Sequence, residues 1–370
     1  MTSPLVSFVV PCYKLAHFLP DCVDSILGQT HANVEVIVMD DHSPDDTATV
    51  VQRYKDDPRV KYVRNDPNLG HLRNYNKGIG LATGEYIWLI SADDKLRAKD
   101  AVERYVKVLE ANSKIAYAFC PAVELNGSGQ ELSVVEWTRP YTSDRTLSSR
   151  EFLRELAQGN CVSAPAVLVR RRCYEQAGAF PLDLPHAGDW FLWCAFAALG
   201  DVAYVADPLI YYRVHGSQMS VDLVGNKLAL VRNDQSQVRW RLKEMADRTG
   251  YSDVSQECLE RLAHRWAVDL ALGAAVPSPR ETRDSIAAVP EKYLQARERA
   301  PFTASVLRQS ADQLYENGKV DLAKTFYRAA LADDPWQPGV RAKLLLALLG
   351  PAGVALRRHL RGARATKAAG

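Results

Sequence analysis

Two adjacent carboxylates, Asp93 and Asp94, follow a short apolar run at residues 86–90. A short run rich in β-forming residues is typical of a buried strand in a parallel sheet, whose ligands bind outside the carboxyl ends of the strands. Two neighbouring carboxylates repel each other unless a cation lies on one of them or between them. Oxygen ligands without a His/Cys cluster suit Mg²⁺ or Mn²⁺ bound to a phosphate. A solvated turn whose aspartate caps the next helix is the alternative interpretation.

A second acidic pair, Asp40 and Asp41, ends the apolar run at residues 34–39. Because parallel strands bring their carboxyl ends to the same edge of a sheet, both pairs can surround one nucleoside diphosphate. One carboxylate can accept a hydrogen bond from the imide N–H of uracil or thymine while another holds the metal ion. Capping of the following helices is again the alternative.

Strand-like and helix-like segments alternate through residues 1–222. The segments expected as strands lie at residues 6–10, 34–39, 60–63, 86–90, 115–119, 165–169, 202–205 and 209–213. Most are followed by apolar residues at helical spacing, which predicts an α/β fold with a Rossmann-like, mostly parallel sheet and helices on both faces. Residues 124–145 are polar and irregular, and we expect an excursion or edge hairpin over the site.

Residues 223–370 show helical periodicity without strand patterns, which predicts a separate all-α region. Residues 307–335 have the spacing of one tetratricopeptide repeat, but a single repeat cannot bury its own apolar face. A helical hairpin that docks on the catalytic domain, or on a second subunit in a homo-oligomer, is therefore favoured over a peptide-binding array. No acidic residue follows Asp334, and leucines alternate there with basic residues. This tail fits either a helix on an anionic membrane surface or a solvated end.

The composition excludes several classes of protein. A net charge of +2 over 370 residues gives no signal for nucleic-acid binding. Seven scattered cysteines indicate reduced thiols rather than a disulfide framework or a zinc site. The N-terminus lacks the charged region of a signal peptide, and no apolar run approaches the roughly 20 residues that span a membrane. We therefore expect a cytoplasmic protein, with peripheral contact at the inner face of the membrane as the alternative for the tail.

The ordered motifs resemble those of the family 2 glycosyltransferases with the GT-A fold. They are Val-Ser-Phe-Val-Val-Pro-Cys-Tyr at 6–13, Asp-Asp-His-Ser-Pro-Asp-Asp-Thr at 40–47, Asn-Leu-Gly at 68–70, and Ser-Ala-Asp-Asp at 91–94. Each motif is weak alone, but the ordered set across residues 4–220 is specific. The resemblance implies an inverting transfer of a sugar from a UDP- or dTDP-sugar, with Mn²⁺ or Mg²⁺, to an acceptor hydroxyl. The acceptor would be a glycan, a lipid-linked glycan or a natural product, as in polysaccharide biosynthesis.

The resemblance also implies roles on the nucleotide side of the site. Pro11 and Tyr13 would flank the base, and Asp41, with Asp40 beside it, would contact the pyrimidine. Arg73 would approach the nucleotide from the helix at residues 71–81.

The same resemblance implies which residues would bind the metal ion. Asp93 would contact the ribose or the metal ion, and Asp94 would bind the metal directly. Ser91 stands where many members of the family have a further aspartate. His215, in the segment Tyr-Tyr-Arg-Val-His-Gly-Ser, resembles the closing motif of the family and would reach the metal or the pyrophosphate. A histidine on a surface loop is the alternative.

On the acceptor side, Asp189 resembles the carboxylate of the family's acidic motif, often Glu-Asp-Trp, although Gly188 replaces the usual glutamate. Direct displacement at the anomeric carbon requires a base opposite the leaving diphosphate, and a carboxylate near the acceptor hydroxyl supplies it. Burial beside Trp190 and Trp193 would raise the pKa of this carboxyl group and make it a better base. An N-cap role for Asp189 is the alternative, and the two roles are compatible.

Two other functions remain as alternatives. A sugar-phosphate nucleotidyltransferase shares the α/β sheet and the metal carboxylates. Such an enzyme normally has a glycine-rich phosphate loop after its first strand, whereas residues 11–14 are Pro-Cys-Tyr-Lys. A non-catalytic scaffold that binds sugar nucleotides is disfavoured by the intact Asp94, Asp189 and His215.

Overall fold

The computed structural model describes residues 3–216, 218, 227–273, 276–337, 339–349 and 353. The chain divides into two compact units, Met1–Val238 and Arg239–Gly370. The predicted boundary between residues 222 and 223 lies outside the described residues.

Among the described residues, the larger sheet has eight strands in the order β3-β2-β1-β4-β10-β6-β11-β9. These are β1 (Val6–Cys12), β2 (Val34–Asp40), β3 (Val60–Arg64), β4 (Tyr86–Leu89), β6 (Ile115–Phe119), β9 (Arg145–Leu147), β10 (Val167–Arg170) and β11 (Asp201–Tyr204). β1 to β4 run parallel, and β10 runs antiparallel between β4 and β6. The predicted α/β class is confirmed, and the carboxyl ends of β1, β2 and β4 share one edge.

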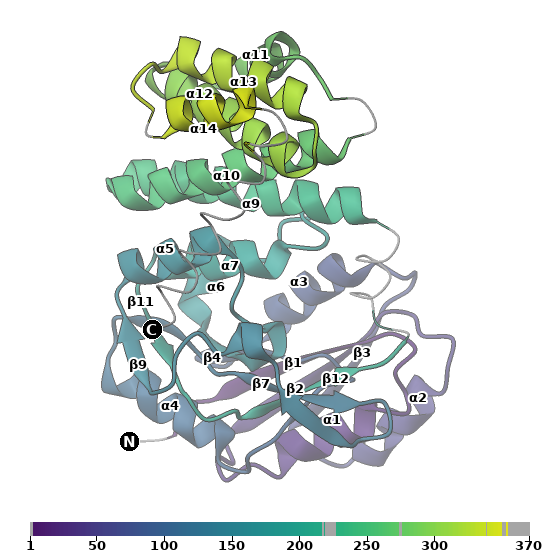
Figure 1. Ribbon diagram of the computed structural model, residues 1–370. Coiled ribbons are helices and arrows are strands. Elements are labelled where there is room, and N and C mark those ends of the chain that lie inside the picture. The colour runs from purple at the N-terminus through teal and green to yellow at the C-terminus, as the bar shows by residue number, and fades with distance from the viewer. Residues whose placement is uncertain are drawn as a thin grey trace. The chain divides into compact units, whose positions relative to one another are not determined.

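Helices cover both faces of this sheet (Figure 1). They are α1 (Leu19–Leu27), α2 (Thr47–Val50), α3 (His71–Leu81), α4 (Ala101–Ala111), α5 (Ser149–Gln158), α6 (Arg171–Ala177) and α7 (Gly188–Ala197). α1 and α4 pack on the face of β1 that carries Phe8. α3 packs on the other face, where a Cβ added to Gly78 would lie 2.4 Å from Val9 Cγ1. This close approach of helix and strand explains the glycine in α3.

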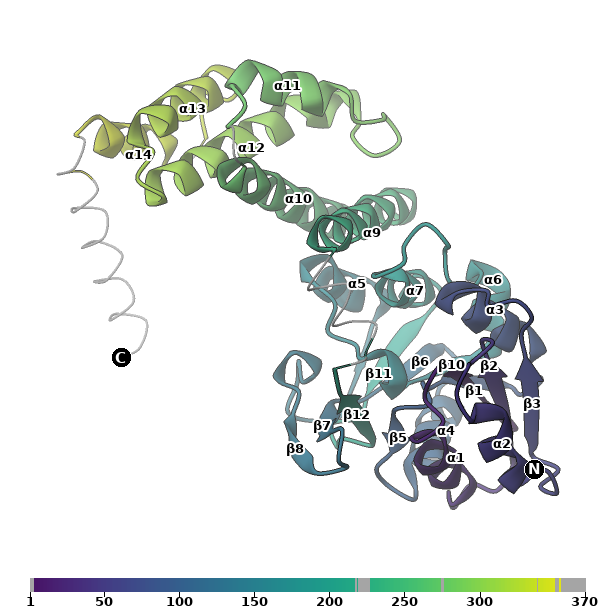
Figure 2. The ribbon, with the colours of Figure 1, turned by 90° about the vertical axis from the view of Figure 1, so that its right-hand side faces the viewer.

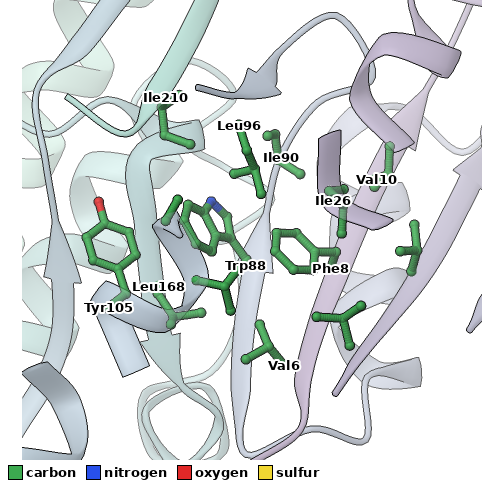
Figure 3. Packing of buried hydrophobic residues seen from close by; sticks show 14 of the residues in the cluster. Val6, Phe8, Val10, Ile26, Trp88, Ile90, Leu96, Tyr105, Leu168 and Ile210 are labelled. Atoms are coloured by element: carbon green, nitrogen blue, oxygen red, sulfur yellow. The ribbon is translucent and has the colours of Figure 1, made fainter. Parts of the chain in front are cut away.

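Aromatic rings fill the centre of the core between the sheet and its helices (Figure 3). Phe8 of β1 stacks on Trp88 of β4 with their centroids 5.3 Å apart, and Tyr105 of α4 lies 5.0 Å from the same tryptophan ring. The Trp88 indole donates a hydrogen bond of 2.7 Å to the Pro165 carbonyl, so its polar atom is satisfied in the interior. The core therefore fixes the strand that precedes the Asp93–Asp94 pair.

A smaller sheet has the order β5-β12-β7-β8 (Figure 2). Its strands are β5 (Lys95–Leu96), β7 (Ala122–Asn126), β8 (Glu131–Val134) and β12 (Ile210–Val214). β7 and β8 form the edge hairpin expected within residues 124–145. β5 follows Asp94 directly and pairs with β12, so this sheet holds the turn that carries the two carboxylates.

In the first unit, a buried carboxylate joins four segments of the larger sheet. Glu35 of β2 accepts hydrogen bonds from Ser7 Oγ at 2.6 Å, Lys61 Nζ at 2.8 Å and the Thr83 backbone N–H at 2.8 Å. Ser7 Oγ in turn accepts from the N–H of Gly84, where an added Cβ would lie 2.6 Å from the Leu5 carbonyl oxygen. Burial alone would raise the pKa of Glu35, but hydrogen bonds from Lys61, from Ser7 and from both the hydroxyl and the N–H of Thr83 lower it to about 2.

The second unit consists of helices. The helices of this part of the chain are α9 (Leu228–Thr249), which begins in the first unit, α10 (Ser252–Leu272), α11 (Pro279–Ala287), α12 (Ala296–Glu316), α13 (Val320–Asp333) and α14 (Val340–Leu348). α12 and α13 pack against each other through one apolar cluster (Figure 2). The apolar positions with tetratricopeptide-like spacing all belong to it: Leu307, Leu314, Ala323, Tyr327 and Ala330.

The Glu35 network predicts an acid-sensitive contribution to stability. Because the pKa of Glu35 is lower in the folded state, its contribution is complete above the unfolded pKa and is lost as the pH falls toward about 2. Glu35→Gln should lower the free energy of unfolding at pH 7 by about 1–3 kcal/mol, the usual cost of a buried group left without its partner. It should also flatten the dependence of stability on pH between about 4.5 and about 2.

Urea unfolding of the wild type and of Glu35→Gln, at pH 7 and across the range from about 4.5 to about 2, measures the difference in the free energy of unfolding. Glu175→Gln removes an exposed carboxylate from a pair with Arg171 on α6 and should change little. Equal stabilities for Glu35→Gln and Glu175→Gln would contradict the role of the network.

Candidate active site

Asp94 lies where the two sheets meet. Its side chain is 4% exposed, and Oδ1 accepts a hydrogen bond of 2.9 Å from the backbone N–H of Arg213 in β12. Burial, followed by the neighbouring charge of Asp93, raises the pKa of Asp94 well above its usual range. A carboxylate that is costly to ionise alone is stabilised by a bound cation.

Asp93 carries the unsatisfied polar atom of this pair. Its Oδ2 lies 3.0 Å from Nε2 of His215, which follows β12. Its Oδ1 is buried and has no hydrogen-bond partner among the described residues. Because buried polar atoms in proteins nearly always have a partner, this oxygen is suited to a ligand or a metal ion. The structure thus brings together Asp93, Asp94 and His215, which the sequence analysis assigned to one site.

The chemistry of these three side chains fits a divalent ion that arrives with a diphosphate. The described residues contain no group of three His, Cys, Asp or Glu side chains arranged as a ready metal site. Mg²⁺ is usually held by one or two carboxylates, with substrate phosphates and water as further ligands. The unpaired Oδ1 of Asp93, together with Asp94 and His215, matches that requirement better than a closed protein cage.

Arg213 holds the acidic turn in place, and the sequence analysis did not single it out. It is 2% exposed, and its Nε donates a hydrogen bond of 2.7 Å to the Asp93 carbonyl. Its Nη2 lies 3.0 Å from Asp21 Oδ2, and its guanidinium lies 4.4 Å from the centroid of the Phe18 ring. The Tyr-Tyr-Arg-Val-His segment points to this arginine, because Arg213 lies near the end of β12 and two residues before His215.

The two residues of the second acidic pair, Asp40 and Asp41, have different surroundings. Asp40 is fully buried and accepts hydrogen bonds from Tyr62 Oη, from Arg64 Nη1 at 2.8 Å and from the Ser43 N–H at 2.8 Å. Both of its oxygens are engaged within the fold, where Asp40 fixes the end of β2 against β3, and its contact with the nucleotide stays a prediction.

Asp41 points into the loop that precedes α3. Its Oδ1 accepts from the Leu69 N–H and from Asn65 Nδ2, both at 2.8 Å, and its Oδ2 accepts from the Gly70 N–H at 2.9 Å. Gly70 has a φ of 80°, a conformation that glycine adopts without strain. Asp41 therefore anchors the loop, and its contact with a pyrimidine stays a prediction.

The residues expected around the base lie at the end of β1 and on α3. Tyr13 is 45% exposed, with Lys14 Nζ 5.0 Å from the centroid of its ring. The carbonyl of the buried Pro11 accepts a hydrogen bond of 3.1 Å from the Ala92 N–H, which ties the end of β1 to the acidic turn. Arg73 is exposed on α3. The exposed tyrosine ring is suited to stacking on a nucleobase.

Asp189 lies in the first turn of α7, after the N-cap residue Ala187, so the alternative N-cap role is wrong. The carboxylate accepts a hydrogen bond of 2.7 Å from the Trp190 N–H and a long one of 3.4 Å from Asn160 Nδ2. Burial raises the pKa of Asp189 to about 6, against the lowering effect of these hydrogen bonds. Such a group is largely ionised at neutral pH and remains basic enough to accept a proton.

Tyr75 of α3 links the two sides of the site, and the sequence analysis missed it. Burial raises the pKa of its hydroxyl, and the negative charges of four aspartates raise it further. They are Asp93, Asp189, Asp94 and Asp41. The carboxylates expected at the nucleotide, at the metal and at the acceptor therefore all influence one side chain.

The segment before α7 is held by side chains from distant elements. Asn76 makes two hydrogen bonds with the backbone of Phe180, at 2.9 and 2.8 Å, and His71 Nε2 lies 3.0 Å from the Pro185 carbonyl. Asp234 of α9 accepts from the His186 N–H at 2.8 Å. None of these contacts follows from local sequence, because their partners are 48 to 114 residues apart.

Comparison with known proteins shows the family of this site. Residues 7–174 match the description "Glycosyl transferase family 2". A protein named "uncharacterized glycosyltransferase" from Rickettsia typhi is 30% identical over 218 residues, which cover 58% of this chain and 66% of that protein. A protein of the same name from Haemophilus influenzae is 29% identical over 225 residues, covering 59% and 68%. The chain thus spans about two thirds of these relatives.

The hyaluronan synthase of Pasteurella multocida is 27% identical over 225 residues, but these cover only 22% of that protein. Among solved structures, S. aureus TarS in complex with UDP-GlcNAc has a TM-score of 0.61 over 85% of this chain and 92% of that chain, at 16% identity. This likeness shows a shared GT-A-type fold. The match over residues 7–174 and the relative from Rickettsia typhi show that this part of the chain belongs to glycosyl transferase family 2.

Proposed function

We propose that this protein is a metal-dependent inverting glycosyltransferase that moves a sugar from a UDP- or dTDP-sugar to an acceptor hydroxyl. The observation that carries the proposal is the Asp93–Asp94 turn, where His215 Nε2 lies 3.0 Å from Asp93 Oδ2, and the high-pKa Asp189 adds a candidate base. Transfer with inversion needs a cation beside the leaving diphosphate and a base near the acceptor, and these carboxylates supply a place for both.

The residues of this chain have separate tasks in the proposed reaction. Tyr13 stacks on the base, and Asp93, Asp94 and His215 hold the divalent ion. A bound Mn²⁺ or Mg²⁺ would neutralise the charge of the departing diphosphate. Asp189 accepts the proton of the acceptor hydroxyl as that oxygen attacks the anomeric carbon.

The acceptor is proposed to be a glycan, a lipid-linked glycan or a natural product. The name of the Pasteurella relative, a hyaluronan synthase, supports a place in polysaccharide biosynthesis. The UDP-GlcNAc complex of TarS makes uridine nucleotides the first donors to test.

Incubation with UDP- and dTDP-sugars, with and without Mn²⁺, tests the proposal as a whole. Release of the nucleoside diphosphate and transfer of the sugar should require the metal. A nucleotidyltransferase would instead release pyrophosphate from a nucleoside triphosphate and a sugar phosphate. A scaffold protein would bind the donor, which raises the melting temperature by mass action, but would not turn it over.

The end of the helical unit supports a second proposal, contact with an anionic membrane surface. None of the described helices is long and apolar enough to cross a membrane. α14 exposes Leu345, Leu348 and Leu349, while Trp336, 84% exposed, packs its ring near the guanidinium of Arg341. Apolar side chains among basic residues, with no acidic residue after Asp334, suit an anionic lipid surface. The basic tail at residues 357–367 lies outside the described residues, and a second copy of the chain is the alternative partner.

The metal assignment predicts the effect of Asp94→Asn. The amide oxygen can still accept the hydrogen bond from the Arg213 N–H, so the fold should persist while the charge is lost. The Mn²⁺-dependent affinity for UDP should fall by at least about 10–100-fold, the usual effect of disturbing even the outer contacts of a metal site. Calorimetric titration measures it, with Asp207→Asn, remote and paired with Arg104, as the control. Unchanged affinity in Asp94→Asn would show that the metal binds elsewhere.

The base assignment predicts that Asp189→Asn lowers turnover by about 10²–10⁴-fold, because the amide cannot accept the proton. Donor affinity should stay near that of the wild type, since Asp189 lies on the acceptor side. The wild-type rate should also fall as the pH drops below about 6, where the carboxyl group becomes protonated. Turnover within a few-fold of wild type, at saturating donor and acceptor, would place the base elsewhere, with His186 tested next.

The membrane proposal predicts that the protein sediments with anionic vesicles and that added salt weakens the binding. Replacement of Leu345, Leu348 and Leu349 by serine should weaken it further at low salt, because apolar burial supplies part of the affinity. Sedimentation with neutral vesicles is the control. Equal binding to both vesicle types would contradict the proposal of an anionic surface. A concentration-dependent dimer that the serine variant abolishes would favour a second copy of the chain.

A further inference from the structure

The backbone around Tyr75 is fixed on both sides. Asn76, the next residue of α3, makes two hydrogen bonds with the backbone of Phe180. His71, one turn earlier, lies 3.0 Å from the Pro185 carbonyl. A Cβ added to Gly188 would lie 3.2 Å from Cδ1 of Phe180, so the start of α7 packs closely on this contact. Tyr75 therefore lies where α3 meets the segment that leads to the proposed base.

The ring of Tyr75 is held by two aromatic neighbours. Its centroid lies 5.7 Å from that of His71 and 5.3 Å from that of Phe180, and both contacts are edge-to-face. Such contacts orient a ring as well as burying it. The direction of the hydroxyl is thus determined before any substrate binds.

The hydroxyl itself has no structural task. Among the described residues, none makes a hydrogen bond with Tyr75 Oη, and the interactions of this side chain are its ring contacts and the charges around it. Tyr75 is partly exposed, and a tyrosine hydroxyl that supports the fold usually has a partner within the protein. This group is instead free to bind a ligand.

The negative charges of four carboxylates act on the hydroxyl, and ionised carboxylates only accept hydrogen bonds. A hydroxyl whose pKa is raised stays protonated and can donate. The transferred sugar must lie between the metal-side pair Asp93–Asp94 and the acceptor-side Asp189. Its hydroxyl groups both donate and accept, so Tyr75 supplies the donor that the carboxylates cannot provide.

We propose that Tyr75, clamped between His71 and Phe180 at the junction of α3 with the 180–189 segment, donates a hydrogen bond to a hydroxyl of the transferred sugar and so helps to select the donor sugar. This inference rests on the proposed function and adds a sugar-recognition residue to it. The nucleotide is held elsewhere, at the ends of β1 and β2, and does not need this contact.

The test compares Tyr75→Phe with the wild type in calorimetric titrations with Mn²⁺. The probes are UDP, UDP-GlcNAc and UDP-glucose, with the corresponding dTDP compounds if the uridine series binds weakly. The variant removes one oxygen and keeps the ring contacts, so its melting temperature should match that of the wild type. Tyr174→Phe is the matched control. Tyr174 is a buried tyrosine of α6 whose ring centroid lies 4.8 Å from that of Phe196 on α7.

The expected result is unchanged affinity for UDP and a loss of about 3- to 10-fold for the preferred sugar nucleotide, the size of one neutral hydrogen bond. A donor that lacks the contacted hydroxyl should bind the wild type and Tyr75→Phe equally, because the pair of changes then removes the same interaction. Deoxy analogues of the preferred sugar identify that hydroxyl.

Three outcomes separate this inference from the proposed function. Equal affinity of the wild type and Tyr75→Phe for the preferred sugar nucleotide and all deoxy analogues overturns the role of Tyr75 and leaves the glycosyltransferase assignment standing. An equal loss for UDP and for the sugar nucleotide overturns it too, since the residue would then act on the nucleotide. Failure of the wild type to bind any nucleotide or nucleotide sugar overturns the proposed function and this inference with it.

Discussion

Repulsion among carboxylates at one sheet edge is the constraint that the surrounding structure must offset. The charges of Asp41, Asp93, Asp94 and Asp189 all act on a single tyrosine, and the four carboxylates differ in the hydrogen-bond donors around them. Asp41 accepts from two backbone N–H groups and an amide, whereas Asp189 has one short and one long hydrogen bond. Donors favour the charged form and burial disfavours it. The fold thus gives one residue type several chemical roles, and burial raises the pKa of Asp189 to about 6, which suits this carboxylate to take a proton.

Arg213 connects this charge to the rest of the fold. It comes from the smaller sheet, and its backbone N–H and side chain both contact the Asp93–Asp94 turn. Because it is buried, the arginine would be left as an uncompensated charge if Asp21 or the turn moved away. The two sheets are therefore coupled through the same residues that hold the proposed metal ligands, and the small sheet contributes to the proposed site.

The sequence predicted the strand ends well because buried parallel strands leave short apolar runs, and the eight expected strands are all present. The strands it missed, such as β5 (Lys95–Leu96) and β9 (Arg145–Leu147), are two and three residues long and have no periodicity to read. Asp40 and Asp41 could not be distinguished because consecutive side chains leave a strand in opposite directions and only distant partners decide their roles. Tyr62 and Arg64 donate hydrogen bonds to Asp40, and no local sequence pattern predicts these contacts.

The proposed base and the proposed metal ligands are positioned by different kinds of interaction. The acidic turn belongs to paired strands, but the segment before Asp189 is held by Asn76, His71 and Asp234, which contact its backbone atoms. Because these hydrogen bonds involve backbone atoms of the segment, side chains such as Leu182, which is 51% exposed, take no part in them. Substitutions in this segment can therefore reshape the acceptor side while the base and the nucleotide edge keep their places. A fold built in this way can serve many acceptors with one donor geometry, because the two sides of the reaction depend on separate sets of bonds.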